Sequence, residues 1–152
     1  MTVKGKHQLE VELKKLLHEE RPAVIRAIED ARAQGDISEN AEYDAAKERQ
    51  ALIEGRIAEI QGKLAGAEVI DPSTIKADRV VFGAHVVVLD LESEESSTYQ
   101  IVGVDEADVK LGLISVMSPI SRALIGKRVG DVITVQSPKG DKDYEIVSFE
   151  YK

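Results

Sequence analysis

The stretch Ile53-Glu54-Gly55-Arg56-Ile57-Ala58-Glu59-Ile60-Gln61-Gly62-Lys63-Leu64 carries its large aliphatic residues at steps of four, three and four. Such spacing places them along one narrow face of a helix, which is the apolar seam of a coiled coil. The residues between them are charged or small, so the other faces favour water. The pattern predicts a long helix over residues 39–65 that needs a partner for its seam.

The partner is predicted immediately upstream, over residues 8–34. Its aliphatic residues recur at helical spacing: Leu9, Leu13, Leu16, Val24, Ile28 and Ala31. Pro22 lacks a backbone donor, so it predicts either a kink or the start of a new helix. Gly35 can adopt the left-handed conformation that ends a helix. Two helices of equal length joined by a short turn predict an antiparallel coiled-coil hairpin with a projecting tip.

The chain changes composition after Asp71-Pro72-Ser73, where valine, isoleucine and threonine replace the helix formers. This change predicts strands, separated by turns rich in glycine, proline and charged residues. The expected strands cover residues 80–82, 84–89, 98–102, 113–116, 129–135 and 144–151. Ser118 and Pro119 predict a short helix that Gly126 ends. The fold class is therefore α+β: a helical hairpin over residues 1–73, and an antiparallel sheet with a short helix over residues 74–152.

Charge and composition exclude several classes of function. Lys and Arg number 20 and Asp and Glu number 28, giving a net charge of −8, which disfavours binding to bare duplex DNA. The chain has no cysteine, so disulfides, thiolate zinc sites and thiol nucleophiles are excluded. No apolar run approaches the length of a membrane span, and no signal-peptide core follows the first residues. We expect a soluble, cytoplasmic protein that does not interact with membranes.

The turn between the helices carries the residues best suited to chemistry. Asp36 and Glu39 are three residues apart, so their carboxylates can face the same way, and Mg²⁺ prefers such oxygen ligands. The same Asp-x-x-Glu spacing is also a helix capping box, and spacing alone favours that interpretation. Arg32, Lys47 and Arg49 flank the turn and could attract a phosphate backbone, although charged residues on a solvated helix face are the simpler explanation.

Two segments give a more specific indication. Gly35-Asp36-Ile37-Ser38-Glu39-Asn40-Ala41-Glu42-Tyr43 and the following Ala45-Ala46-Lys47-Glu48-Arg49-Gln50 resemble the signature of the GreA/GreB transcript-cleavage factors of bacterial RNA polymerase. Further similar segments lie in the second half, at residues 81–84, 101–103, 114–116, 118–120 and 124–127. The resemblance therefore covers nearly the whole chain, and the turn segment is long enough to be specific.

The resemblance implies a function for each half. In that family the hairpin enters the secondary channel of RNA polymerase, and a C-terminal domain of FKBP-like fold docks at the channel mouth. The acidic pair, here Asp36 and Glu39, helps to hold a second Mg²⁺ and its water in the polymerase active site, where the 3′ end of backtracked nascent RNA is cleaved. The chain would be no enzyme by itself, since it only adds ligands to the active site of polymerase. We also expect it to be a monomer.

The resemblance also assigns supporting roles. Arg32 and Lys47 match basic positions that meet the extruded RNA, although Lys47 stands where arginine is common and lacks bidentate phosphate geometry. The residues expected to support the tip are Gly35, Ser38, Asn40 and Tyr43. Those expected to dock on polymerase are Ser118, Pro119, Ile120 and Arg122.

Two other functions remain open at the level of sequence. One is a channel-binding protein of the same shape that inhibits transcription, although the Asp-x-x-Glu-Asn arrangement at residues 36–40 argues against it. The other is a peptidyl-prolyl isomerase or chaperone, suggested by the FKBP-like domain. An aromatic content of 4% provides little of the aromatic-lined pocket that such activity needs.

Overall fold

The computed structural model of this chain describes residues 1–34 and 40–152, which form two compact units. One unit is residues 6–67. The other combines residues 1–5 with residues 68–152. The first five residues thus group with the C-terminal part of the chain. The division predicted from the sequence, between residues 73 and 74, places them with the hairpin.

The contacts of Thr2 explain this grouping. Thr2 is 3% exposed and forms a parallel bridge with Ile70, whose carbonyl accepts a hydrogen bond from the Val3 amide at 3.2 Å. The Glu106 carboxylate accepts from the Thr2 amide at 2.7 Å and from the Thr2 hydroxyl. The Gly5 amide donates to Thr2 Oγ1 at 3.1 Å, and a Cβ at Gly5 would collide with the Glu106 side chain. Residues 1–5 therefore have specific partners in the C-terminal unit.

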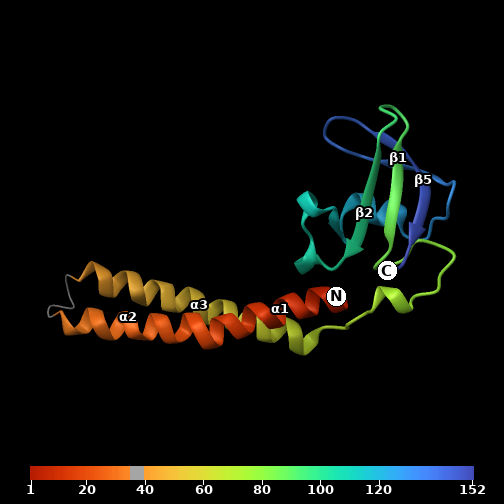
Figure 1. Ribbon diagram of the computed structural model, residues 1–152. Helices are drawn as coiled ribbons and strands as arrows, with labels where there is room; N and C mark the ends of the chain where they lie inside the picture. Colours follow the sequence, from red (N-terminus) through yellow and green to blue (C-terminus); the bar gives the residue numbers. More distant parts are fainter. Residues whose placement is uncertain (35–39) are drawn as a thin grey trace. The chain divides into compact units, whose positions relative to one another are not determined.

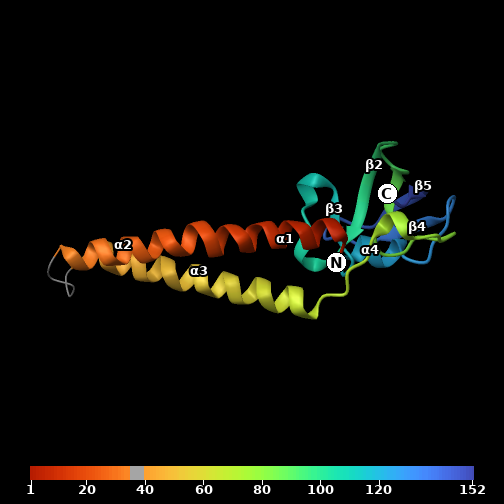
Figure 2. The same cartoon turned by 60° about the horizontal axis from the view of Figure 1, so that its bottom comes forward.

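The N-terminal half is helical, as predicted. Its elements are α1 (Val3–Lys15), the π-helical turn η1 (Leu16–Glu20), α2 (Arg21–Ala33) and α3 (Ala41–Gly66). The first three follow one another along one rod, and α3 lies beside α2 (Figures 1 and 2). The predicted hairpin of long helices is confirmed, and α3 begins at residue 41 instead of residue 39.

The apolar seam holds the two rods together. Its buried members are Leu9, Leu16, Val24, Ile28, Ala31, Ala46, Ile53, Ile57 and Ile60. The residue pairs that meet across the seam run in opposite directions along the chain, because Ala31 contacts Asn40 whereas Arg21 contacts Glu54. The helices are therefore antiparallel, and burial of a narrow aliphatic stripe provides their main stabilisation.

Pro22 is accommodated by a local change of helix type. In η1 the Arg21 amide bonds to the Leu16 carbonyl, five residues back, and Pro22 follows in the first turn of α2. A π turn widens the helix by one residue, which removes the need for the donor that proline lacks. Neither a sharp kink nor a new chain direction is required at this position.

Charged side chains join the two rods outside the seam. Arg21 forms two hydrogen bonds with the Glu54 carboxylate, at 2.7 and 2.8 Å. Arg56 bonds both oxygens of Glu12, at 2.8 and 2.9 Å, and also pairs with Glu59 at 3.2 Å. The hydrogen bond from Arg56 is the main reason that the pKa of Glu12 is lowered from its ordinary value. Exposed ion pairs contribute little net stability, so we attribute to them the alignment of the helices.

The second unit is built on a five-stranded sheet in the order β3-β2-β1-β5-β4. The strands are β1 (His85–Asp90), β2 (Ser96–Val102), β3 (Leu113–Ser115), β4 (Val132–Val135) and β5 (Lys142–Glu150). Short helices accompany them: η3 (Pro72–Thr74), η4 (Val104–Glu106), η5 (Val109–Leu111) and α4 (Pro119–Leu124). A bulge in the β1–β5 pairing falls between Val87 and Val88.

The core of this unit lies between the sheet and α4. Its buried residues are Val80, Ala84, Val86, Val88, Ile101, Ile114, Leu124, Ile133 and Ile146. The predicted antiparallel sheet with a short helix is confirmed for the pairings β1–β2, β1–β5 and β4–β5. It is corrected for β3, which pairs with β2 in parallel. The connection between them contains η4 and η5 and crosses back before β3 begins, and such a crossover is what parallel pairing requires.

The prediction of a strand over residues 80–82 is also wrong. Val80 is fully buried and exchanges hydrogen bonds with the turn after α4, through Lys127 O at 2.8 Å and the Gly126 amide at 2.7 Å. The chain then turns at Gly83, whose φ of +90° suits glycine. This segment is held by its backbone partners in a turn and does not extend the sheet.

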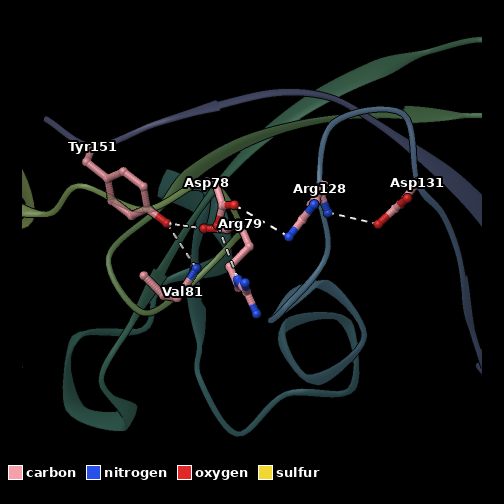
Figure 3. Close-up of polar contacts among 6 residues, drawn as sticks. All are labelled: Asp78, Arg79, Val81, Arg128, Asp131 and Tyr151. Carbon is pink, nitrogen blue, oxygen red and sulfur yellow. Dashed lines mark hydrogen bonds and ion pairs between the residues drawn. The ribbon is translucent and has the colours of Figure 1, made fainter.

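A cluster of polar contacts also holds this segment (Figure 3). The Tyr151 hydroxyl donates to the Arg79 carbonyl at 2.7 Å and accepts from the Val81 amide at 3.0 Å. Asp78 pairs with Arg79 at 3.3 Å and with Arg128 at 3.4 Å. The chain that enters the sheet is therefore tied to the chain that leaves it.

Candidate functional site

The end of the hairpin is where the predicted functional residues concentrate. The structure describes the chain up to Gln34, which caps the end of α2, and again from Asn40, which caps the start of α3. Gly35, Asp36, Ser38 and Glu39 lie outside the described residues. What the structure provides is the geometry of the two helix ends between which these residues are placed in the sequence.

Asn40 joins these helix ends. Its Oδ1 accepts a hydrogen bond from the Tyr43 amide at 3.1 Å, which is the typical N-cap interaction. Its Nδ2 donates to the carbonyl of Ala31 in the last turn of α2 at 2.6 Å. Ala31 is 2% exposed, so the helices are also packed closely at this point. One side chain thus satisfies a free donor of α3 and holds α2 beside it.

This arrangement bears on the capping-box interpretation of the Asp-x-x-Glu spacing. In a capping box the residue at the N-cap bonds the amide three residues later. Asn40 holds that position in α3 and bonds the amide of Tyr43. Asn40 is therefore the N-cap of α3. Asp36 and Glu39 lie outside the described residues, so the capping and the oxygen-ligand interpretations of their spacing both stay predictions.

Basic and aromatic side chains meet on the flank of the hairpin end. The Arg32 guanidinium lies over the Tyr43 ring, 5.8 Å from its centroid, within the range of a cation–π contact. Lys47 follows Tyr43 by four residues on α3, so the two share a helix face. The Lys47 ammonium donates to Gln50 Oε1 at 3.2 Å. The structure thus brings Arg32 and Tyr43 together from two helices and places Lys47 one turn further along.

The four predicted docking residues gather at the start of α4. Ser118 is its N-cap, with Oγ accepting from the Ser121 amide at 3.2 Å, and Pro119 opens the helix. Pro119 and Arg122 are exposed, whereas Ile120 is half-buried against the core. The predicted helix start at these residues is confirmed.

An apolar hollow of about 330 Å³ lies beside this helix start. Its lining residues are Tyr99, Ala107, Val109, Leu113, Ile114, Ser115, Ser118 and Ile120. Val109, which lines the hollow, is 78% exposed. Leu111 and Met117, which lie within two residues of a lining residue in the sequence, are 72% and 56% exposed. Ser118 and Ile120 were among the predicted docking residues, whereas Val109 was not. The sequence does contain an indication of it. Val109 and Leu111 are aliphatic residues in a connection otherwise rich in charged residues and glycine, where exposed apolar side chains suggest an interaction site.

Metal-binding clusters and membrane-spanning helices are both absent from the described residues. Residues 1–34 and 40–152 contain no group of three or more histidine, aspartate or glutamate side chains arranged to hold a metal ion. Over the same ranges, none of the helices combines the length and the apolar character needed to cross a membrane.

Comparison with known proteins adds the following. A family model described as "Transcription elongation factor, N-terminal" matches residues 1–69, and one described as "Transcription elongation factor, GreA/GreB, C-term" matches residues 75–151. The chain is 57% identical to a transcription elongation factor GreA of Acidiphilium cryptum, over 99% of this chain and 96% of the relative. It is 59% identical to a protein of the same name from Thioalkalivibrio sulfidiphilus, again over 99% and 96%. The corresponding protein of Halorhodospira halophila is 56% identical, over 100% of this chain and 97% of the relative.

Proposed function

Since the chain belongs to the GreA/GreB family of transcription elongation factors, we propose that it binds in the secondary channel of RNA polymerase and stimulates cleavage of backtracked nascent RNA near its 3′ end. The observation that carries the proposal is the joined hairpin end. There the hydrogen bond between Asn40 and Ala31 joins the helices that precede and follow residues 35–39, and Arg32 contacts Tyr43 across the same two helices. Chain connectivity keeps Asp36 and Glu39 within a few residues of these anchored positions.

In this proposal Asp36 and Glu39 provide carboxylate oxygens to a Mg²⁺ ion that RNA polymerase largely holds. The donor set fits, because Mg²⁺ prefers oxygen ligands and proteins often bind it through one or two carboxylates together with phosphates. Bound magnesium in such a centre activates water and stabilises the leaving oxygen of a phosphodiester. The factor is then no enzyme alone, since it completes an active site whose remaining parts belong to its partner.

Arg32 and Lys47 would attract the phosphates of the extruded RNA 3′ segment. The overall charge of −8 opposes binding to nucleic acid, so these two cations act locally, next to the acidic motif, after the hairpin has entered the channel. The Tyr43 ring supports this role, because it limits the positions that the Arg32 guanidinium adopts.

The apolar hollow beside α4 is the proposed contact with polymerase. An exposed aliphatic side chain such as Val109 at a concave apolar surface is typical of an interaction site. Ser118, Pro119 and Ile120 border the same hollow or open the helix next to it. Affinity for polymerase would thus come mainly from the sheet unit.

The test uses a halted elongation complex with backtracked, end-labelled RNA. The wild-type chain with Mg²⁺ is expected to release short 3′ fragments, whereas Asp36→Asn and Glu39→Gln leave only the slow cleavage of polymerase alone. In competition with labelled wild type, each variant should displace it from polymerase at the same concentration as unlabelled wild type does. Full cleavage by both variants would refute the metal role, and slower nucleotide addition without fragments would indicate an inhibitor.

A further inference from the structure

Asn40 has an unusual position in this chain. It is the only asparagine in the sequence, and its amide forms hydrogen bonds to two different helices. The oxygen serves the first turn of α3 through the Tyr43 amide, and the nitrogen serves the last turn of α2 through the Ala31 carbonyl. The Ala31 carbonyl also accepts from the Gln34 amide at 3.3 Å, so the end of α2 is closed at the same point.

The chemistry of the site explains why an amide is needed. Serine and aspartate cap helices about as well as asparagine does. Serine is too short to bridge to a second helix, and a carboxylate at this position has no proton to donate to a carbonyl. Asparagine alone among the preferred capping residues combines the acceptor with a donor of sufficient reach. The bond to Ala31 therefore explains a choice of residue that capping does not.

We infer that Asn40 is a positioning residue for the proposed Mg²⁺-dependent cleavage, because its two hydrogen bonds set the separation of the helix ends that precede and follow residues 35–39. The inference rests on the proposed function. Asn40 touches neither metal nor RNA in this scheme; it acts by holding the end of α2 and the start of α3 together. Small displacements of reacting groups cost large factors in rate, so a single interhelical hydrogen bond at this place matters for cleavage.

The isolated protein offers a direct test of the contact. Because Asn40 is the only asparagine, protein labelled with ¹⁵N-asparagine gives a single side-chain amide pair in an NMR spectrum. The Nδ2 proton that bonds to Ala31 is expected to be shifted downfield and to exchange with water at least about tenfold more slowly than in a free asparagine peptide. Two protons with the shifts and exchange rates of the peptide would overturn the inference.

The cleavage assay tests the consequence. Asn40→Ser keeps a capping oxygen and loses the donor, so maximal cleavage at saturating factor is expected to fall about tenfold or more and half-maximal Mg²⁺ to rise several-fold. The concentration of factor that gives half-maximal cleavage should stay within about twofold, because docking is unaffected. Asn40→Asp, which keeps a stronger cap, replaces Asn40→Ser if the latter loses helicity by circular dichroism.

Two control variants separate the possible failures. Glu54→Gln breaks the Arg21 pair elsewhere in the same hairpin and should leave the Mg²⁺ dependence unchanged. Asp36→Asn, run in parallel, reports on the proposed function itself. If Asp36→Asn is inactive while Asn40→Ser cleaves with the wild-type rate and Mg²⁺ profile, the positioning role is wrong. If Asp36→Asn cleaves normally, the proposed function fails instead.

Discussion

Individual hydroxyl and amide groups hold several parts of this molecule at points where regular secondary structure ends. Tyr151 is half-buried and its hydroxyl bonds two backbone groups of the chain entering the sheet, at Arg79 and Val81. Burial raises the pKa of Tyr151 above its ordinary value of 10.0, and the hydrogen bond from the Val81 amide opposes the shift. Asn40 and Ser118 have comparable roles at helix starts.

We predict that Tyr151→Phe destabilises the sheet unit by about 1 kcal/mol, because two backbone groups lose a partner. The Val81 amide should lose protection in hydrogen exchange followed by NMR, whereas Tyr144→Phe, a ring packed on the same core, should leave it protected. The sign of the pH effect follows from the raised pKa. The stabilisation from the neutral Tyr151 hydroxyl is fully present below pH 10 and is lost as pH rises through the higher folded-state pKa. Because phenylalanine has no hydroxyl to titrate, the free energy of unfolding of Tyr151→Phe should fall less at alkaline pH.

Some features of the site could be predicted from the sequence, and others could not. Ser118 was recognisable as a cap because Pro119 follows it and a short apolar run comes next. Asn40 was expected to support the tip, but its bond to Ala31 joins positions nine residues apart across a turn, and no local pattern encodes that contact. The Arg32–Tyr43 contact was missed for the same reason. Asp36 and Glu39 remain predictions, since they lie outside the described residues.

Whole elements were easier to predict than their ends and pairing. The seam of α3 and the strands β1, β2, β4 and β5 follow from periodicity and composition, because burial on one face forces those patterns. The parallel direction of β3 did not follow, since it depends on how η4 and η5 return the chain. The π turn before Pro22 was also missed, because a kink and a widened turn both accommodate a missing donor.

Glycines at two positions allow a matched test of these elements. Gly55 lies exposed within α3, and a Cβ there would meet nothing within 4 Å, so Gly55→Ala should stabilise the hairpin by about 0.5–1 kcal/mol. Gly112 has a φ of +75°, and a Cβ there would lie 2.9 Å from the Thr98 carbonyl oxygen. Gly112→Ala should therefore destabilise the sheet unit by about 1–2 kcal/mol.

Thermal unfolding followed at 222 nm reports mainly on the hairpin, and hydrogen exchange of the β2 amides reports on the sheet unit. Gly55→Ala should raise the midpoint temperature of the transition at 222 nm and leave the exchange of the β2 amides unchanged. Gly112→Ala should speed the exchange of the β2 amides. A gain of sheet stability in Gly112→Ala would mean that the backbone at this position differs from the structure described.

At the scale of the whole molecule, the two units divide the proposed work. The hairpin is thin and charged, and its apolar residues are used to hold its own helices together. The sheet unit has a core of its own and still leaves Val109 exposed at an apolar hollow. We therefore expect affinity for polymerase to depend on one unit and the rate of cleavage on the other.

Val109→Glu tests this division. Val109 is 78% exposed, so the substitution should cost little folding stability, but it places a charge at the rim of the apolar hollow. The concentration of factor that gives half-maximal cleavage is expected to rise about tenfold, with the maximal rate unchanged, because an interaction common to all bound states is lost. Val132→Glu, at a valine 57% exposed on strand β4, is the control and should behave as the wild type. A lower maximal rate in Val109→Glu at unchanged half-saturation would show that the hollow serves cleavage and not docking.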